Sequence, residues 1–199
     1  MITRKEMTRM LLKEGLLSCL ANNSFETVTV TSLCKASGIT RSTFYLHYSN
    51  IMEIVDDLVD DAIAYSKPGM VDNNNLQTIA NTLSAASNSV ALREAYDSIF
   101  DRLPLCQRII RHKKYLPLFL DEQISEYVLQ RIIGREKDRQ GLVMAEALGI
   151  SFDVGVSIFI FLVHGLYAVN KQYKWSQSDE WLEAQKIIFE LVYRGLQRK

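Results

Sequence analysis

The chain of 199 residues has little of what several protein classes require. It contains only three prolines, and no segment alternates apolar and polar residues as a strand would, so the pattern predicts helix throughout. Cysteine is equally scarce. Cys19, Cys34 and Cys106 are odd in number, far apart in the sequence and flanked by apolar residues. This pattern favours reduced thiols in a cytosolic core over a disulfide framework or a metal site.

Catalytic motifs are lacking as well. The sequence has no Gly-x-Ser-x-Gly, no phosphate-binding glycine loop and no cysteine–histidine pair with a reason to be activated. His164 lies in an apolar stretch without another metal-ligating residue at a suitable spacing, so we interpret it first as a core histidine. We therefore expect no enzyme activity, no cofactor and no metal.

Segments that would direct the chain to a membrane are not evident. The start, MITRKEMTRM, has no long apolar run, and residues 152–169 are interrupted by Asp153, Ser157, His164 and two glycines. We predict neither a signal peptide nor a membrane span, and a cytoplasmic protein.

Neither sign of charge is in excess, since 23 basic residues balance 23 acidic ones. The distribution is uneven, however: residues 1–50 carry six basic and three acidic side chains, and the remainder is acidic by the same margin. A basic end on a neutral chain is a modest indication of a polyanionic partner.

Hydrophobic periodicity predicts an all-α fold in two domains. A first helix over residues 3–22 carries Met7, Met10, Leu11, Leu17 and Leu20 near helical spacing, and two short helices and a helix over 51–65 follow. The polar segment 67–75 predicts the boundary between an N-terminal three-helix domain (1–66) and a larger helical bundle (67–199). In that bundle we expect helices over 76–102, 105–113, 118–137, 151–173 and 178–196, with a solvated turn over 134–141.

The most informative stretch is Thr29 to Ile54, TVTSLCKASGITRSTFYLHYSNIMEI. Thr29 can cap a helix whose Leu33 and Ala36 face inward, and Gly38 suits a tight turn with positive φ. Thr40 then caps a second helix over residues 41–48, in which Phe44 and Tyr48 share the inward face. This helix turns Ser42, Thr43, Tyr45 and Leu46 outward. Two short helices joined by a glycine turn are typical of a helix-turn-helix.

Over residues 8–60 the chain resembles the TetR family of bacterial transcription regulators, most closely in Arg41-Ser42-Thr43-Phe44-Tyr45-Leu46-His47-Tyr48. The chain departs from the family at Ser24, where a glycine is common, and at Ile51, where a lysine that contacts phosphate is usual. The second departure shifts the expected phosphate contacts toward Arg4, Lys5 and Arg9.

The resemblance implies that the helix of residues 41–47 enters the DNA major groove. Arg41 is then a candidate for a bidentate contact to guanine, although a phosphate-bound or solvated arginine is an equal alternative. Leu46 touches a thymine methyl group or packs on the first helix. The full set of predicted DNA-binding residues is Thr29, Thr40, Arg41, Ser42, Thr43, Tyr45, Leu46 and His47.

The second domain is expected to supply a homodimer interface and a pocket. Residues 154–163 are apolar nearly all round, with Gly155 and Gly165 permitting close helix approach, and the last helix places Trp181, Ala184, Ile188, Leu191 and Gly195 on one stripe. Two such helices and their symmetry mates would make a four-helix interface. Tentative pocket residues, each also compatible with a core role, are Tyr96, Phe100, Phe119, Tyr127 and His164.

We therefore predict a dimeric regulator that binds a palindromic operator, most simply a repressor released by a small-molecule effector that shifts the helix of residues 51–65. A transcriptional activator and a helical interaction module controlled by a protein partner stay open as alternatives. The acids Asp56, Asp57, Asp60 and Asp61 in that helix are interpreted as a solvated face.

Overall fold

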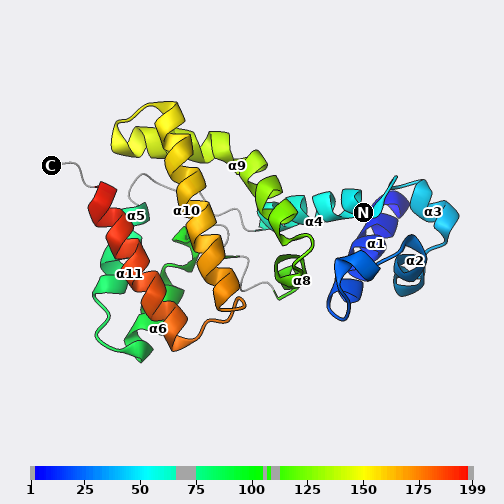
Figure 1. Cartoon of the computed structure of the whole chain (residues 1–199), viewed down its shortest axis with the longest axis horizontal. Helices are drawn as coiled ribbons and strands as arrows, with labels where there is room; N and C mark the ends of the chain where they lie inside the picture. The colour runs from blue at the N-terminus through cyan, green and yellow to red at the C-terminus, as the bar shows by residue number, and fades with distance from the viewer. Residues whose placement is uncertain (1–2, 66–74, 105–106, 109–112, 197–199) are drawn as a thin grey trace. The chain divides into compact units, whose positions relative to one another are not determined.

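The structure, a computed structural model, describes residues 3–65, 75–104, 107–108 and 113–196. Throughout these ranges the chain forms helices and turns and no β-strand, which confirms the predicted all-α fold class (Figure 1). Residues 67–74 of the predicted boundary segment and most of the predicted helix 105–113, with Cys106, lie outside the described residues.

The chain divides into two compact units. Unit 1 comprises residues 1–65 and 112–132, and unit 2 comprises residues 66–111 and 133–199. The N-terminal helices end where unit 2 begins, but a later segment, 112–132, belongs with them.

Unit 1 contains α1 (Arg4–Leu20), a short 3-10 helix (Phe25–Thr27), α2 (Val30–Ser37), α3 (Arg41–Tyr45), α4 (Ile51–Tyr65), α8 (Leu116–Leu120) and the first turns of α9 (Ser125–Leu148). Its core is made of side chains with no exposed surface. They include Leu12 and Leu16 of α1, Leu33 of α2 and Phe44 of α3. Met7, Met10 and Leu11, which the predicted pattern of the first helix included, are instead about 40% exposed, because α1 turns the Leu12–Leu16 side to the core.

Unit 2 contains the rest of α9, α5 (Asn75–Ser84), α6 (Ser89–Ser98), a 3-10 helix (Phe100–Arg102), α10 (Phe152–Gln172) and α11 (Asp179–Leu196). The predicted helix 76–102 is thus interrupted, because Asn88 caps a new helix by accepting a hydrogen bond from the Ala91 N–H at 2.9 Å. α11 packs against α5 and α6. The indole of Trp181 is fully buried there, edge-on to the Tyr96 ring with centroids 5.2 Å apart.

The predicted turn at 134–141 is wrong, since α9 continues unbroken to Leu148. Gly141 serves packing instead. A Cβ on Gly141 would lie 2.4 Å from Val156 Cγ2, and a Cβ on Gly155 would lie 2.3 Å from the Gly141 carbonyl oxygen. Two glycines therefore let α9 and α10 approach closely, as predicted for Gly155, whereas Gly165 faces open space within the described part of the chain.

Candidate nucleic-acid interface

α2 begins with a reciprocal cap. The Thr29 hydroxyl oxygen accepts from the Ser32 N–H at 3.1 Å, and the Ser32 hydroxyl oxygen accepts from the Thr29 N–H at 2.9 Å. Two amides that the first turn would leave unpaired are thereby satisfied. Leu33 is buried as expected, but Ala36 is exposed, so one of the two predicted inward residues of this helix is wrong.

The turn after α2 depends on Gly38. This residue lies in the left-handed region, with φ of 68°, and its N–H donates to the Cys34 carbonyl. The next amide, on Ile39, donates to the same oxygen at 3.1 Å. The arrangement closes α2 with an αL cap and turns the chain into α3.

Replacing Gly38 by alanine is expected to destabilise unit 1 by about 1–2 kcal/mol, because a side chain with a Cβ is strained in this conformation. The added Cβ itself would meet no atom within 4 Å, so the loss reports backbone strain and not a clash. Urea denaturation followed by circular dichroism measures it. Gly134→Ala is the control: that glycine also lies in open space, but within α9, where alanine is favoured. Equal losses in both variants would contradict the prediction.

α3 is shorter than the predicted helix 41–48. Thr40 caps it by accepting from the Thr43 N–H at 3.2 Å, and helical bonding ends in a turn in which the Tyr48 N–H donates to the Phe44 carbonyl at 2.9 Å. The buried and exposed faces of α3 agree with the faces that helical periodicity predicts. Phe44 and Tyr48 are 0% and 3% exposed. On the opposite side Tyr45 and Leu46 are 54% and 81% exposed.

The predicted DNA-binding residues gather along one segment of unit 1. The 81% exposure of Leu46 favours contact with DNA over packing on α1, the other of its two predicted roles. Thr43 and His47 are half-buried. The remaining members of the set are exposed: Thr29, Thr40, Arg41, Ser42 and Tyr45.

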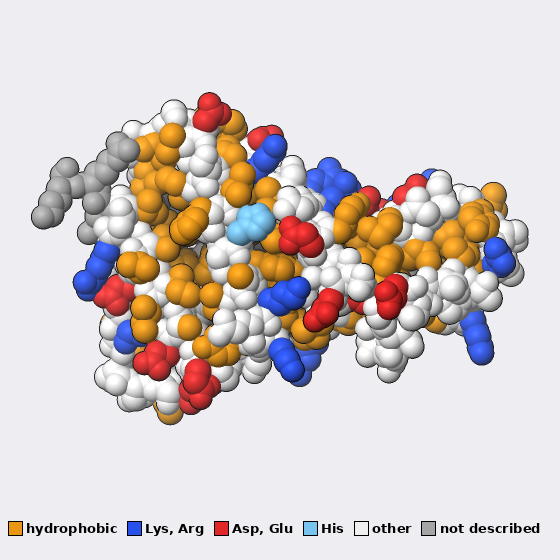
Figure 2. Space-filling model, viewed as in Figure 1, with side chains coloured by type: hydrophobic (Ala, Val, Ile, Leu, Met, Phe, Trp, Pro, Cys, Tyr) orange, Lys and Arg blue, Asp and Glu red, His pale blue; other side chains and the backbone are white. Residues whose placement is uncertain are grey.

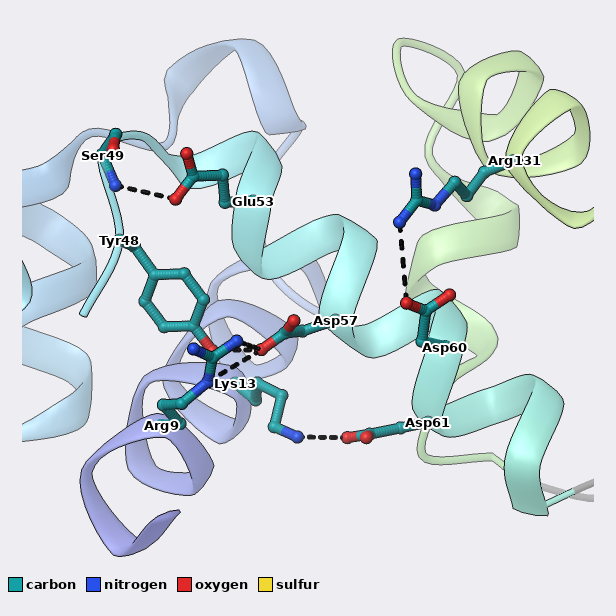
Figure 3. Close-up of polar contacts among 9 residues, drawn as sticks. All are labelled: Arg9, Lys13, Tyr48, Ser49, Glu53, Asp57, Asp60, Asp61 and Arg131. Atoms are coloured by element: carbon teal, nitrogen blue, oxygen red, sulfur yellow. Dashed lines mark hydrogen bonds and ion pairs between the residues drawn. The ribbon is translucent and has the colours of Figure 1, made fainter. Parts of the chain in front are cut away.

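Arg9 of α1 is held by α4 (Figure 3). Asp57 Oδ2 accepts from both Arg9 Nε, at 3.1 Å, and Arg9 Nη2, and it accepts from the Tyr48 hydroxyl at 2.6 Å. The guanidinium also lies over the Tyr48 ring, 4.6 Å from its centroid. The hydrogen bond to Asp57 raises the pKa of Arg9. The pKa of Tyr48 is raised mainly by burial and, to a smaller extent, by its hydrogen bond to Asp57.

One helical turn further along both helices, Lys13 pairs with Asp61 (Figure 3). The other two aspartates of α4 contact α9. Asp56 accepts from the Tyr127 hydroxyl at 2.6 Å, and Arg131 forms ion pairs with Asp56 and Asp60 at 3.4 and 3.6 Å. The prediction that these four acids form a solvated face is therefore wrong. A sequence signal existed, because each acid pair and each pair of partners is spaced by four residues and so lies on one helix face.

These pairs change the expected distribution of positive charge. Arg9, predicted to take over phosphate contacts, is engaged by Asp57 instead, and Lys13 is engaged by Asp61. Arg4, Lys5, Lys35 and Arg41 are exposed. The charge available to a polyanion thus comes from the start of α1, from α2 and from α3.

The tentative pocket residues fall in different units. Tyr96, Phe100 and His164 belong to unit 2, and Phe119 and Tyr127 belong to unit 1. Tyr96 and Phe119 are buried, Phe100 and His164 are half-buried, and Tyr127 is 40% exposed. The Tyr96 hydroxyl donates to Gln107 Oε1 at 3.1 Å, and the Gln107 amide donates to Gln185 Oε1 at 2.8 Å. Sequence reasoning missed these two buried glutamines, since polar residues in a helical pattern are normally assigned to the surface.

An apolar face of α10 and α11 is left uncovered by the described chain (Figure 2). Val154 and Phe161 of α10 are 46% and 74% exposed, and Ile187 and Leu191 of α11 are 58% and 71% exposed. We call these four residues the apolar face. Trp181, predicted on the same stripe as Leu191, is instead turned into the core, where its Nε1–H donates to Asn170 Oδ1 at 3.0 Å.

α10 is also the one described helix with the length and apolar composition needed to cross a membrane, although only 22% of the relevant stretch is buried. Core helices of soluble proteins pass the same test, so the observation carries little weight. The prediction that residues 152–169 do not span a membrane stays a prediction.

The described residues contain no group of three or more histidine, cysteine, aspartate or glutamate side chains that could hold a metal ion. Comparison with protein-family models and with curated protein sequences gives no match to this chain.

Proposed function

We propose that this protein is a DNA-binding transcription regulator whose α2 and α3 form a helix-turn-helix. One observation carries the proposal: a capped helix, a glycine turn and a second capped helix present Arg41, Ser42 and Tyr45 to solvent while Phe44 and Tyr48 anchor the opposite side. The resemblance of residues 8–60 to TetR-type regulators points the same way. Regulators of this kind read DNA by placing the second helix in the major groove.

In that role the predicted DNA-binding residues divide into two kinds. Arg41 would make a bidentate contact to guanine and Leu46 would contact a thymine methyl group, while Ser42 and Thr43 are short enough to let the helix approach the bases. Thr29, Thr40, Tyr45 and His47 would position the helix on phosphates, because hydroxyl, imidazole and amide N–H groups are common phosphate donors.

A homodimer completes the proposal. One short recognition helix contacts only a few base pairs. Two DNA-binding domains of a dimer, one DNA turn apart, recognise a palindrome. The apolar face of α10 and α11 supports pairing with a second copy, because large exposed apolar patches are uncommon on monomeric soluble proteins. On this proposal the protein acts in the cytoplasm as a repressor that a small effector releases from DNA. A transcriptional activator would use the same helix-turn-helix and the same dimer interface.

The test is a gel shift with the duplex that lies upstream of the gene, for wild type and Arg41→Ala, at two salt concentrations. Loss of a bidentate base contact is expected to cost about 1–3 kcal/mol, or roughly a five- to 150-fold weaker specific complex. Lys186→Ala is the matched control, because it removes a positive charge in unit 2, where Lys186 Nζ donates to the Ala86 carbonyl at 2.8 Å. Equal affinity of wild type and Arg41→Ala, or no binding that survives competitor DNA, would refute sequence-specific recognition through α3.

A second candidate function is a helical interaction module whose N-terminal helix-turn-helix no longer binds DNA. The pairing of Arg9 and Lys13 with α4 favours it, since two of the six basic side chains in residues 1–50 are then not free to meet phosphate. The same gel shift separates the two candidates, because the interaction module would bind no duplex even at low ionic strength.

A further inference from the structure

Residues 113–132 lie far from the N-terminal helices in the sequence, yet they bond to them at three places within unit 1. Lys114 Nζ pairs with Glu14 of α1 at 2.5 Å, and the bond to Glu14 raises the pKa of Lys114. Asp121 Oδ2 accepts from the Phe25 N–H at 2.7 Å. The third place is α4, which meets Tyr127 and Arg131.

The contact with α4 is the most specific of the three. The Tyr127 hydroxyl and the Arg131 guanidinium both meet Asp56. Arg131 also pairs with Asp60, the contact that Figure 3 shows. The bond to Asp56 raises the pKa of Tyr127. These acids are half-exposed, and each pair taken alone contributes little to stability. Their effect is on position, because two side chains four residues apart fix the register of α9 along α4.

α4 therefore carries acids on two faces, and each face holds a different element. Asp57 and Asp61 hold Arg9 and Lys13 of α1, and Asp57 also holds Tyr48, directly after α3. Asp56 and Asp60 hold the first turns of α9. A displacement of α9 along α4 would move the carboxylates that fix α1 and the end of α3.

We propose that residues 113–132 clamp the N-terminal helices and that Tyr127 and Arg131 are positioning residues, which set the orientation of α3 for DNA through α4. The consequence for DNA rests on the proposed function, but the clamp does not. α9 continues beyond Ile132 into unit 2, so the same helix that holds α4 also belongs to the unit in which an effector is expected. This gives Tyr127 a role different from the predicted lining of a pocket.

The experiment compares wild type with a Tyr127→Phe, Arg131→Gln double variant of the full chain by hydrogen exchange with mass spectrometry. Amides of α4 are expected to exchange about two- to tenfold faster, since the three side-chain contacts that Tyr127 and Arg131 make with α4 are lost. Amides of α5 and α11, in unit 2, are the internal reference and should not change. Gln130→Ala is the matched control, because this exposed side chain of α9 donates to Glu126 at 2.9 Å and, among the described residues, to no part of α4.

The same proteins are titrated with the duplex upstream of the gene. The double variant is expected to bind three- to tenfold more weakly, whereas Arg131→Lys, which keeps the charge, and Gln130→Ala bind as wild type does. Unchanged exchange in α4, or an equal increase in every helix, overturns the clamp. Faster exchange of α4 with unchanged DNA affinity overturns the positioning role. A wild type that binds no duplex defeats the proposed function instead, and the exchange measurement still decides whether the clamp exists.

Discussion

Replacing Phe44 by alanine is expected to destabilise unit 1 by about 3–5 kcal/mol, the usual cost of removing a buried phenylalanine side chain. Phe44 has no exposed surface, and its ring lies edge-on to Tyr45, with centroids 5.0 Å apart, and 6.3 Å from the ring of Tyr48. The cavity would open between α3 and the elements it packs on. Because α3 has only five residues, packing and not helix propensity holds it in place.

The neighbouring residue provides a matched comparison. Tyr45 is 54% exposed and its ring contacts Phe44, so Tyr45→Ala should lower the free energy of unfolding by only about 0.5–1.5 kcal/mol, well below the loss in Phe44→Ala. On the proposed function it should nevertheless weaken DNA binding, since its hydroxyl is lost from the exposed side of α3. Urea denaturation and the gel shift together separate the two effects. The assignment of faces on α3 fails if Tyr45→Ala unfolds the protein as readily as Phe44→Ala.

Introducing a charge on the apolar face is expected to convert a dimer into monomers. Burial of one leucine side chain at the interface stabilises the dimer by about 1.5–3 kcal/mol. In a twofold-symmetric dimer the substitution is present in both subunits, so the loss is doubled. Leu191→Glu should therefore weaken dimerisation by about 3–6 kcal/mol, which corresponds to roughly a hundred- to ten-thousandfold rise in the dissociation constant. Sedimentation velocity over a range of protein concentrations measures this shift.

Val90→Glu is the control for that experiment. Val90, on α6 of the same unit, is 68% exposed, close to the 71% of Leu191, but it lies outside the apolar face. It should leave the dimer intact. A wild type that sediments as a monomer would refute pairing through this face, as would a Leu191→Glu variant that remains dimeric at low micromolar concentration.

Local features of unit 1 were predictable because their causes lie within a few residues. The caps at Thr29 and Thr40, the left-handed Gly38, and the burial of Phe44 and Tyr48 all follow from hydrogen bonds and helical periodicity inside residues 29–48. The cap of α4 follows the same rule, since Asn50 Oδ1 accepts from the Glu53 N–H at 3.1 Å. The assignment of these residues to DNA binding remains a prediction.

Errors arose where a residue's partner is distant in the sequence. Asp57 is 48 residues from Arg9, and Asp56 is 71 residues from Tyr127, so the spacing within α4 places its acids on two faces but does not identify their partners. Gly141 lies at the end of the predicted turn 134–141, but its missing side chain admits Val156 of α10. Trp181 shared a helical stripe with Leu191, yet only the packing of α11 on α5 and α6 decides which of them is buried.

The sequence by itself determined that the chain is all-helical and where the helices of residues 4–65 begin and end within a few positions, since capping and periodicity act over one or two turns. Only the tertiary structure decided that residues 112–132 fold with those helices, that α4 is held by charges on two faces, and that an apolar face of α10 and α11 stays uncovered. Burial and ion pairing depend on which elements meet, and a linear pattern does not contain that information.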